Sequence, residues 1–183
     1  YGERMNEISK IHNINTELIR IPENKSFNYK YLKQFSSNVS HIAVVHCETT
    51  TGILNDIKSI SNFTNKNKKT LIVDAMSSFG GIPIDMYKNN INYLISSSNK
   101  CLHGPPGLSF CIANKNDIKN LNNKPKTLSL DLKKQYEFLN TYNQFRFTPP
   151  THILNGFNEA LNEFTIFDDI LKREKQYKKY NMI

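Results

Sequence analysis

Two ionisable residues, Asp74 and Lys100, are the first candidates for chemistry, because each follows a short apolar run. Asp74 ends the run 70–74 (TLIVD), and Lys100 follows the run 92–95 (NYLI) after a stretch of serines. Runs of this length predict buried strands, and ligands of open α/β sheets collect at the carboxyl ends of strands. Lys100 comes 26 residues after Asp74, about the length of one connection between parallel strands. A carboxylate and an amine are therefore expected at neighbouring strand ends.

A carboxylate and a lysine amine in this arrangement match the needs of pyridoxal 5′-phosphate. That cofactor requires a lysine for its Schiff base and an acid opposite its pyridine nitrogen. Taken singly, Asp74 is better explained as the N-cap of a following helix, and Lys100 as a solvated surface lysine. The two together, at this spacing, favour a pyridoxal-phosphate site.

Four sequence blocks around these residues resemble the class V aminotransferases, and they occur in the order of that family. Within the family they are most similar to the branch that acts on 2-aminoethylphosphonate. The resemblance covers nearly all of the 183 residues, which is about half of a full family member. The blocks are 46–52 (HCETTTG), 73–81 (VDAMSSFGG), 98–102 (SNKCL) with 104–107 (GPPG), and 146–152 (RFTPPTH).

The resemblance assigns roles to five residues near the cofactor. It makes Lys100 the residue that bonds the cofactor and moves the substrate proton, and Asp74 the partner of the pyridine nitrogen. Thr49 would bond the ring oxygen, Met76 would pack under the ring, and Asn99 would touch the phosphate. Turn hydrogen bonding explains Thr49 equally well, and core filling would explain an isolated methionine.

Thr148 matches a family threonine that reaches the phosphate bound by the other subunit. The resemblance therefore implies a homodimer with shared active sites. Thr148 followed by Pro149 also predicts the start of a helix, where free backbone N–H groups bind phosphate. A plain helix cap is the competing explanation.

The reaction that the resemblance implies is transfer of the amino group of 2-aminoethylphosphonate to pyruvate, a step of phosphonate degradation. Its products are phosphonoacetaldehyde and L-alanine. The alternative within the family is an alanine–glyoxylate or serine–pyruvate aminotransferase. We assign no residue to the phosphonate group from the sequence.

The composition and charge suit a globular protein and leave one alternative of another class. The hydrophobic content is 38% and the formal charge is +8, and neither a signal peptide nor a run of the roughly 20 apolar residues of a membrane span is visible. The lysines are scattered without a nucleic-acid motif, so we expect solvated helix faces and no nucleic-acid or membrane partner. The alternative is a non-catalytic basic fragment that binds polyanions.

The cysteines and histidines predict neither disulfides nor a metal site. Cys47, Cys101 and Cys111 form an odd number without CxxC spacing, which favours a reducing cytoplasm and packed thiols. His46 and His103 lack partners at metal-ligand spacing, so structural roles are expected for both.

Strand and helix patterns alternate along the chain, which predicts βαβ units and a mostly parallel sheet. We therefore expect residues 1–183 to be one partial large domain of fold type I, lacking the family's N-terminal segment and small C-terminal domain, and poorly active or inactive alone. The remaining alternative is an incomplete product whose exposed sheet edges prevent a stable fold. The expected helices are 1–11, 27–35, 53–63, 116–121, one following the loop within 124–139, and 151–180; the expected strands are 17–21, 41–46, 70–74, 92–95 and 108–113.

Overall fold

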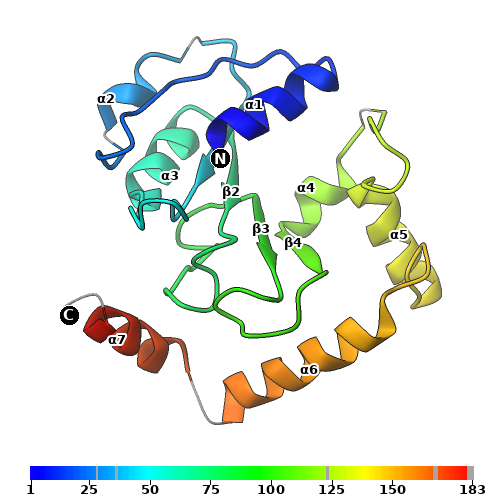
Figure 1. The fold of residues 1–183 in the computed structure, drawn as a ribbon. Helices are drawn as coiled ribbons and strands as arrows, with labels where there is room; N and C mark the ends of the chain where they lie inside the picture. The colour runs from blue at the N-terminus through cyan, green and yellow to red at the C-terminus, as the bar shows by residue number, and fades with distance from the viewer. Residues whose placement is uncertain (28, 36, 123, 167–168, 181–183) are drawn as a thin grey trace.

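The computed structural model describes the chain except residues 28, 36, 123, 167–168 and 181–183. Its centre is a mixed sheet of four strands in the order β1-β2-β3-β4 (Figure 1). The first three strands run parallel and the last is antiparallel to β3, which confirms the expected mostly parallel sheet. The strands are β1 (His41–Val45), β2 (Thr70–Asp74), β3 (Tyr93–Ser97) and β4 (Ser109–Ala113).

The register of the parallel strands brings three chain segments to one edge of the sheet. Val45 pairs with Asp74, and Asp74 pairs with Ile95. Because parallel strands share a direction, the segments that follow β1, β2 and β3 all leave from this edge. Every block that resembles the aminotransferases, apart from 146–152, lies in these segments.

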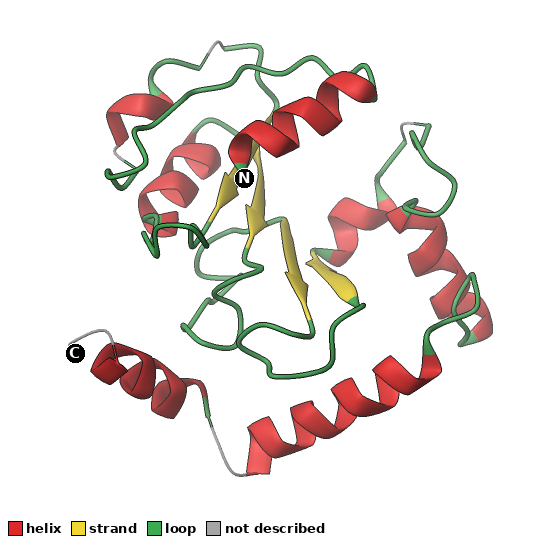
Figure 2. Cartoon of the chain, viewed as in Figure 1, coloured by secondary structure: helices red, strands yellow, loops and turns green. Residues whose placement is uncertain are grey.

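Helices surround the sheet in three groups (Figures 1 and 2). The first three helices gather beside β1 and β2, the next two lie beside β4, and the last two run past the loops at the carboxyl ends of the strands. The helices are α1 (Gly2–Ile11), α2 (Tyr29–Leu32), α3 (Ile57–Lys66), α4 (Lys115–Lys119), α5 (Leu132–Tyr142), α6 (Thr151–Ile166) and α7 (Ile170–Tyr180).

The main core lies between α3 and the sheet. Ile60 of α3 is 1% exposed, and Leu71, Val73 and Leu94 of the two central strands are fully buried. Burying a side chain of this size stabilises the fold by about 1.5–3 kcal/mol. The helix begins where it does because the Asp56 carboxylate accepts a hydrogen bond from the Ser59 N–H, at 3.1 Å.

Three predictions about elements that precede β2 need correction. The strand expected at 17–21 is wrong, since these residues are irregular, although Leu18, Ile19 and Ile21 are half-buried. The apolar residues of this stretch therefore indicate partial burial and not strand pairing. Of the helix expected at 27–35, residue 28 lies outside the described residues and the others form only the single turn α2. The helix expected from residue 53 starts at Ile57, after an isolated bridge between Cys47 and Leu54.

The single helix expected over 151–180 is also wrong, because the structure has two. Helix α6 ends at Ile166 and α7 begins at Ile170. Asp169 caps the second helix, where its side chain accepts from the Lys172 N–H at 2.8 Å and its carbonyl accepts from the Arg173 N–H. An aspartate in this position satisfies the first N–H groups of a new helix.

Candidate active site

Asp74 ends β2 with its carboxylate at the shared edge of the sheet. Its side chain is half-buried, and Oδ1 accepts a hydrogen bond from the Met76 N–H at 2.9 Å. Backbone bonds fix its position on both sides, from His46 N–H to the Asp74 carbonyl (2.8 Å) and from Ala75 N–H to the Ile95 carbonyl (2.9 Å). Its second oxygen, Oδ2, has no partner among the residues that the structure describes. The site thus presents a fixed carboxylate with one oxygen free.

Two side-chain hydrogen bonds join the segment after β1 to the segment after β2. The Thr49 and Ser77 hydroxyls lie 2.6 Å apart, and the buried His46 ring approaches the Ser78 hydroxyl at 2.9 Å through Nδ1. Thr49 is exposed, and its hydrogen bond to Ser77 holds it beside the loop that carries Met76. Ser77 was missed in the sequence, although its place in the 73–81 block was a usable signal.

Lys100 projects from a loop whose backbone is closely tied. The Gly104 N–H donates to the Ser98 carbonyl at 2.8 Å, and the His103 N–H donates to the Lys100 carbonyl at 2.9 Å. Ser98 is fully buried and its hydroxyl donates to the Pro105 carbonyl. The Lys100 side chain itself is exposed, and its amine has no hydrogen bond or ion pair within the described part of the chain. The loop is rigid while the amine is available.

Asn99 lies beside Lys100 with its amide partly occupied. Its Oδ1 accepts a hydrogen bond from the Ser97 hydroxyl at 2.9 Å. The side chain is exposed, and this bond uses only its oxygen. The two amide N–H donors therefore remain available to an anionic oxygen.

Helix α6 packs against the loop 104–107 through positions where larger residues do not fit. A Cβ on Gly104 would lie 2.9 Å from Phe157, and one on Gly107 would lie 2.7 Å from Ile153. Gly107 also has φ +111, a conformation that other residues avoid. The glycines at positions 104 and 107 therefore allow the close approach of α6.

Thr148 is not at the start of α6, so the predicted helix cap is wrong. The helix begins at Thr151, and the Pro150 carbonyl accepts from the Leu154 N–H at 3.0 Å. Thr148 lies exposed in the preceding irregular segment. That segment is anchored by Arg146, which lies 3.8 Å from the Asp131 carboxylate and donates to the Leu128 carbonyl at 3.0 Å. No hydrogen bond joins Thr148 to Asp74 or Lys100 among the described residues.

Burial sets the protonation of the histidine and the thiols near this edge. It lowers the pKa of His46, so that the ring stays neutral. Burial, followed by the charges of Cys101 and Glu48, raises the pKa of the Cys47 thiol. A raised pKa leaves little thiolate. These findings agree with structural roles for His46 and Cys47.

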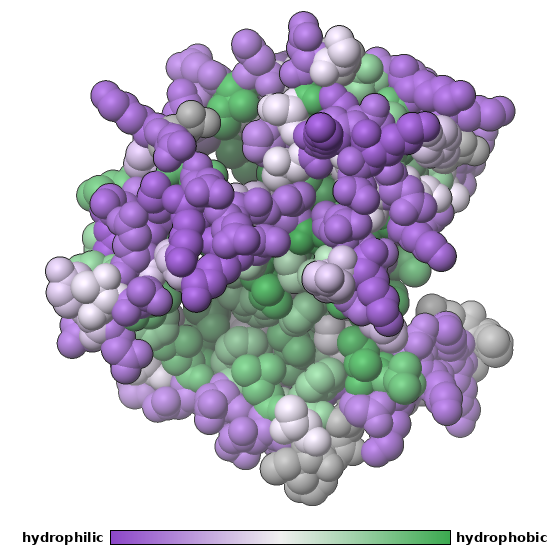
Figure 3. Space-filling model, turned by 180° about the vertical axis from the view of Figure 1, so that it is seen from behind, coloured by the Kyte–Doolittle hydropathy of each residue, from purple (hydrophilic) through white to green (hydrophobic). Residues whose placement is uncertain are grey.

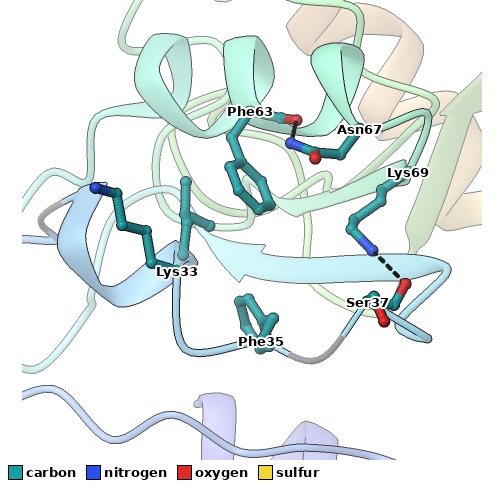
Figure 4. A pocket seen from close by; sticks show the side chains of 7 residues that line it. Lys33, Phe35, Ser37, Phe63, Asn67 and Lys69 are labelled. Carbon is teal, nitrogen blue, oxygen red and sulfur yellow. Dashed lines mark hydrogen bonds between the residues drawn. The ribbon is translucent and has the colours of Figure 1, made fainter.

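A separate hollow lies at the opposite edge of the sheet, where β1 and β2 begin. It has a volume of about 380 Å³ and is lined by apolar rings and by lysine side chains (Figure 4). The Lys69 amine there donates to the Ser37 carbonyl at 3.2 Å. Because Lys69 precedes β2 and Asp74 ends it, this hollow is remote from the candidate active site.

The residues at the carboxyl edge fit the chemical requirements of pyridoxal phosphate. A half-buried carboxylate with a free oxygen suits a protonated pyridine nitrogen, and an amine without a partner suits bonding to an aldehyde. Apolar surface also gathers on the rear of the half of the molecule that contains this edge and α6 (Figure 3). Within the described chain, no cluster of three or more His, Cys, Asp or Glu could hold a metal ion.

The model of the family "Aminotransferase class-V" matches residues 4–182. The chain belongs to this family. Its membership implies pyridoxal 5′-phosphate as the cofactor, in agreement with the donor groups at the sheet edge.

Curated relatives match almost the whole chain. A protein of Phocaeicola vulgatus named 2-aminoethylphosphonate–pyruvate transaminase is 39% identical over 97% of this chain, and one of Bacteroides fragilis with the same name is 41% identical over 97%. A bifunctional phosphonoacetaldehyde hydrolase/aminoethylphosphonate transaminase of Clostridioides difficile is 40% identical over 97%. The chain spans about half the length of the first two relatives (50% of each) and 29% of the third.

Solved structures confirm the fold-type-I architecture. An alanine–glyoxylate aminotransferase from Nostoc superimposes with a TM-score of 0.88 at 20% identity, covering 97% of this chain and 48% of that one. A pyridoxamine–pyruvate aminotransferase from Mesorhizobium loti gives 0.70 at 27% identity, covering 80% and 39%. No described helix has the length and apolar character needed to cross a membrane.

Proposed function

We propose that this chain carries the cofactor site of a transaminase that moves the amino group of 2-aminoethylphosphonate to pyruvate, giving phosphonoacetaldehyde and L-alanine. The observation that carries the proposal is the 39–41% identity, over 97% of the chain, to relatives bearing that name. The shared sheet edge, which carries Asp74 and the Lys100 loop, independently supports the cofactor part of the proposal.

Each site residue has a task that its chemistry can perform. Bound pyridoxal phosphate supplies a ring that accepts electrons from the carbon bearing the substrate amine. Lys100 holds the cofactor through Nζ and, as a free amine, takes and returns the proton at that carbon. Asp74 keeps the pyridine nitrogen protonated through its free oxygen. These two assignments are the core of the proposal.

The remaining residues bind and orient. Thr49, held by Ser77, donates or accepts at the ring oxygen, and Met76 packs against the ring. Asn99 turns its amide N–H groups to the phosphate. Thr148 contacts the phosphate of the cofactor that the partner subunit binds. Its exposed position agrees with this role.

A homodimer with shared sites is part of the proposal. Exposed apolar side chains flank Thr148, including Phe145 (50% exposed) and Phe147 (45%), and Leu128 and Leu130 in the neighbouring segment are 71% and 75% exposed. Surfaces of this kind mark interfaces. Light scattering after size exclusion measures the assembly directly, and a monomer at all concentrations contradicts the shared site.

We also propose a cytoplasmic location and small-molecule partners, without nucleic acid or membrane. The three cysteines are free thiols, as in reducing compartments. Fractionation of cells that produce the protein tests the location.

The decisive experiment adds pyridoxal phosphate to the protein and follows the absorption of the lysine–cofactor bond. Borohydride reduction followed by peptide mass spectrometry is expected to place the label on Lys100, and Lys100→Ala is expected to abolish it. Lys119→Ala, which removes another exposed lysine, serves as the matched control. A label elsewhere, or equal labelling in Lys100→Ala, refutes the assignment.

The substrate is tested by the order in which amines discharge the absorption band. We expect 2-aminoethylphosphonate to act faster than L-serine, and pyruvate to restore the band. A preference for serine, or for alanine with glyoxylate, would support the sibling activities instead. Absence of the band together with nucleic-acid binding that weakens steeply with salt would support the polyanion alternative.

A further inference from the structure

Helix α7 contacts the loop of Lys100 through two side chains one helical turn apart. The guanidinium of Arg173 donates through Nη1 to the carbonyl of Cys101, the residue after the lysine. The Tyr177 hydroxyl lies 3.1 Å from Nε2 of His103. Residues four apart lie on one face of a helix, so a single face of α7 meets both ends of the 101–103 segment.

Arg173 is buried to a degree that is unusual for its type. It is 5% exposed, and its guanidinium carbon lies 4.5 Å from the centre of the Phe164 ring. Burying a cation costs free energy unless it is hydrogen-bonded or stacked, and the planar guanidinium can do both. The hydrogen bond to the Cys101 carbonyl is one of the interactions that stabilise this buried cation, and it is the one that reaches the loop of Lys100.

The loop is also held from the side of Asp74. A Cβ added to Gly81 would lie 2.7 Å from the Cys101 sulfur and 2.8 Å from the Tyr177 ring. The Cys101 thiol is 3.5 Å from the Ser77 carbonyl. The residues after Lys100 are therefore enclosed between α7 and the turn that follows Asp74 (Figure 1).

This enclosure fixes a backbone conformation that the loop does not favour alone. His103 has φ 60°, in the left-handed region, which costs a residue with a side chain on the order of 1 kcal/mol. Its N–H bonds the Lys100 carbonyl and its ring bonds Tyr177. The bond from the His103 N–H to the Lys100 carbonyl ties this conformation to the backbone of the lysine itself.

We propose that Arg173 and Tyr177 are positioning residues for Lys100: they hold the 101–103 segment from α7 and thereby fix the amine, without touching it. The proposal rests on the cofactor role of Lys100 proposed above. In this proposal α7 contributes to the site, although Arg173 lies 72 residues after Cys101 in the chain.

The experiment compares Arg173→Met, Arg173→Lys and Tyr177→Phe with Lys175→Met, an exposed lysine of the same helix whose loss changes the charge equally. The measurements are pyridoxal-phosphate affinity, the rate of borohydride labelling at Lys100, and amide hydrogen exchange at His103 and Gly104 against exchange in β2. We expect Arg173→Met to weaken cofactor affinity about tenfold, Tyr177→Phe about threefold, and Lys175→Met less than twofold. Arg173→Lys should be intermediate because it keeps the charge and can still donate a hydrogen bond, but lacks the planar guanidinium.

Exchange is expected to quicken at His103 and Gly104 more than in β2, which reports loosening of the loop rather than of the whole fold. Equal affinity in Arg173→Met and the parent overturns the positioning role even when the variant melts earlier. Uniform quickening of exchange overturns it too, because the arginine would then stabilise the fold only. If the unsubstituted protein never acquires label at Lys100, the proposed function is overturned as well. This outcome is distinct, because it is seen before any variant is compared.

Discussion

Nδ1 of His46 lies 2.9 Å from the hydroxyl oxygen of Ser78, in a contact that is closed to solvent. It joins the end of β1 to the turn after Asp74, directly behind the proposed site. Because the ring is neutral and buried there, the contact makes the stability of this edge depend on pH.

The first prediction is that acidification destabilises the fold through His46. Burial holds the pKa of His46 below the value of about 6.5 that it has when unfolded. Above pH 6.5 the ring is neutral in both states, so its contribution is complete. Below about 6.5 only the unfolded state takes up the proton, and the free energy of unfolding falls by up to about 1.4 kcal/mol per pH unit until the folded pKa is reached.

Urea unfolding at several pH values between about 5 and 7.5 measures this slope. His46→Gln is expected to flatten the slope by up to one proton, while His152→Gln, at an exposed position of α6, leaves it unchanged. An unaltered slope in His46→Gln would contradict the pKa shift.

The second prediction separates the charge of Asp74 from its hydrogen bond. Asn at this position keeps an oxygen for the Met76 N–H, which lies 2.9 Å from Oδ1, but removes the negative charge. We expect Asp74→Asn to fold normally and to slow the discharge of the bound cofactor by 2-aminoethylphosphonate about 10²–10³-fold, which is typical for loss of an aligned electrostatic group. Stopped-flow absorption measures the rate, and a loss under tenfold would argue against the pyridine partnership.

The parts of this molecule that the sequence predicts well are those in which local pattern and tertiary position agree. Strands β1 and β2 were recognised as short apolar runs and bury one face against the core, while β3 is mostly buried on both faces. For the same reason Asp74 was placed correctly at a strand end. The prediction of neighbouring ends for Asp74 and the Lys100 loop followed from the length of a single connection.

The failures occur where the deciding partner is distant or the local signal is ambiguous. Residues 17–21 have the composition of a strand, yet their apolar side chains are half-buried without regular pairing. The helix boundary at Asp169 was readable as a cap, but the amphipathic pattern on both sides concealed it. Arg173 carries no local sign of its contact, because its acceptor at Cys101 is 72 positions away.

The third prediction concerns the close approach of α7 at Gly81. Alanine there would place its Cβ 2.7 Å from the Cys101 sulfur and 2.8 Å from the Tyr177 ring, so the loop or α7 must shift. We expect Gly81→Ala to lower the free energy of unfolding by about 1–3 kcal/mol, the usual cost of overpacking, and to reduce labelling of Lys100. The control is Gly2→Ala, where no atom lies within 4 Å; equal stability of the two variants would contradict the packing.

The last prediction concerns Asp131, which has two roles in holding the segment of Thr148. Its Oδ1 accepts from the Lys134 N–H at 3.0 Å and caps α5, and its Oδ2 lies 3.8 Å from Arg146, with only 11% and 18% of the two side chains exposed. Asparagine preserves the cap and removes the ion pair, whereas alanine removes both. Loss of a cap costs about 1 kcal/mol, and a poorly hydrated ion pair adds to that.

We therefore expect Asp131→Ala to lower the free energy of unfolding by about 1–2 kcal/mol and Asp131→Asn by less than about 1 kcal/mol. Urea unfolding at low and high salt measures both, and the effect of Asp131→Asn should shrink with salt because only the ion pair is screened. Since Arg146 precedes Thr148 by two residues, both variants should also weaken dimerisation if this segment reaches the partner subunit. Loss of stability without any change in assembly would show that the Thr148 segment is not part of the proposed interface.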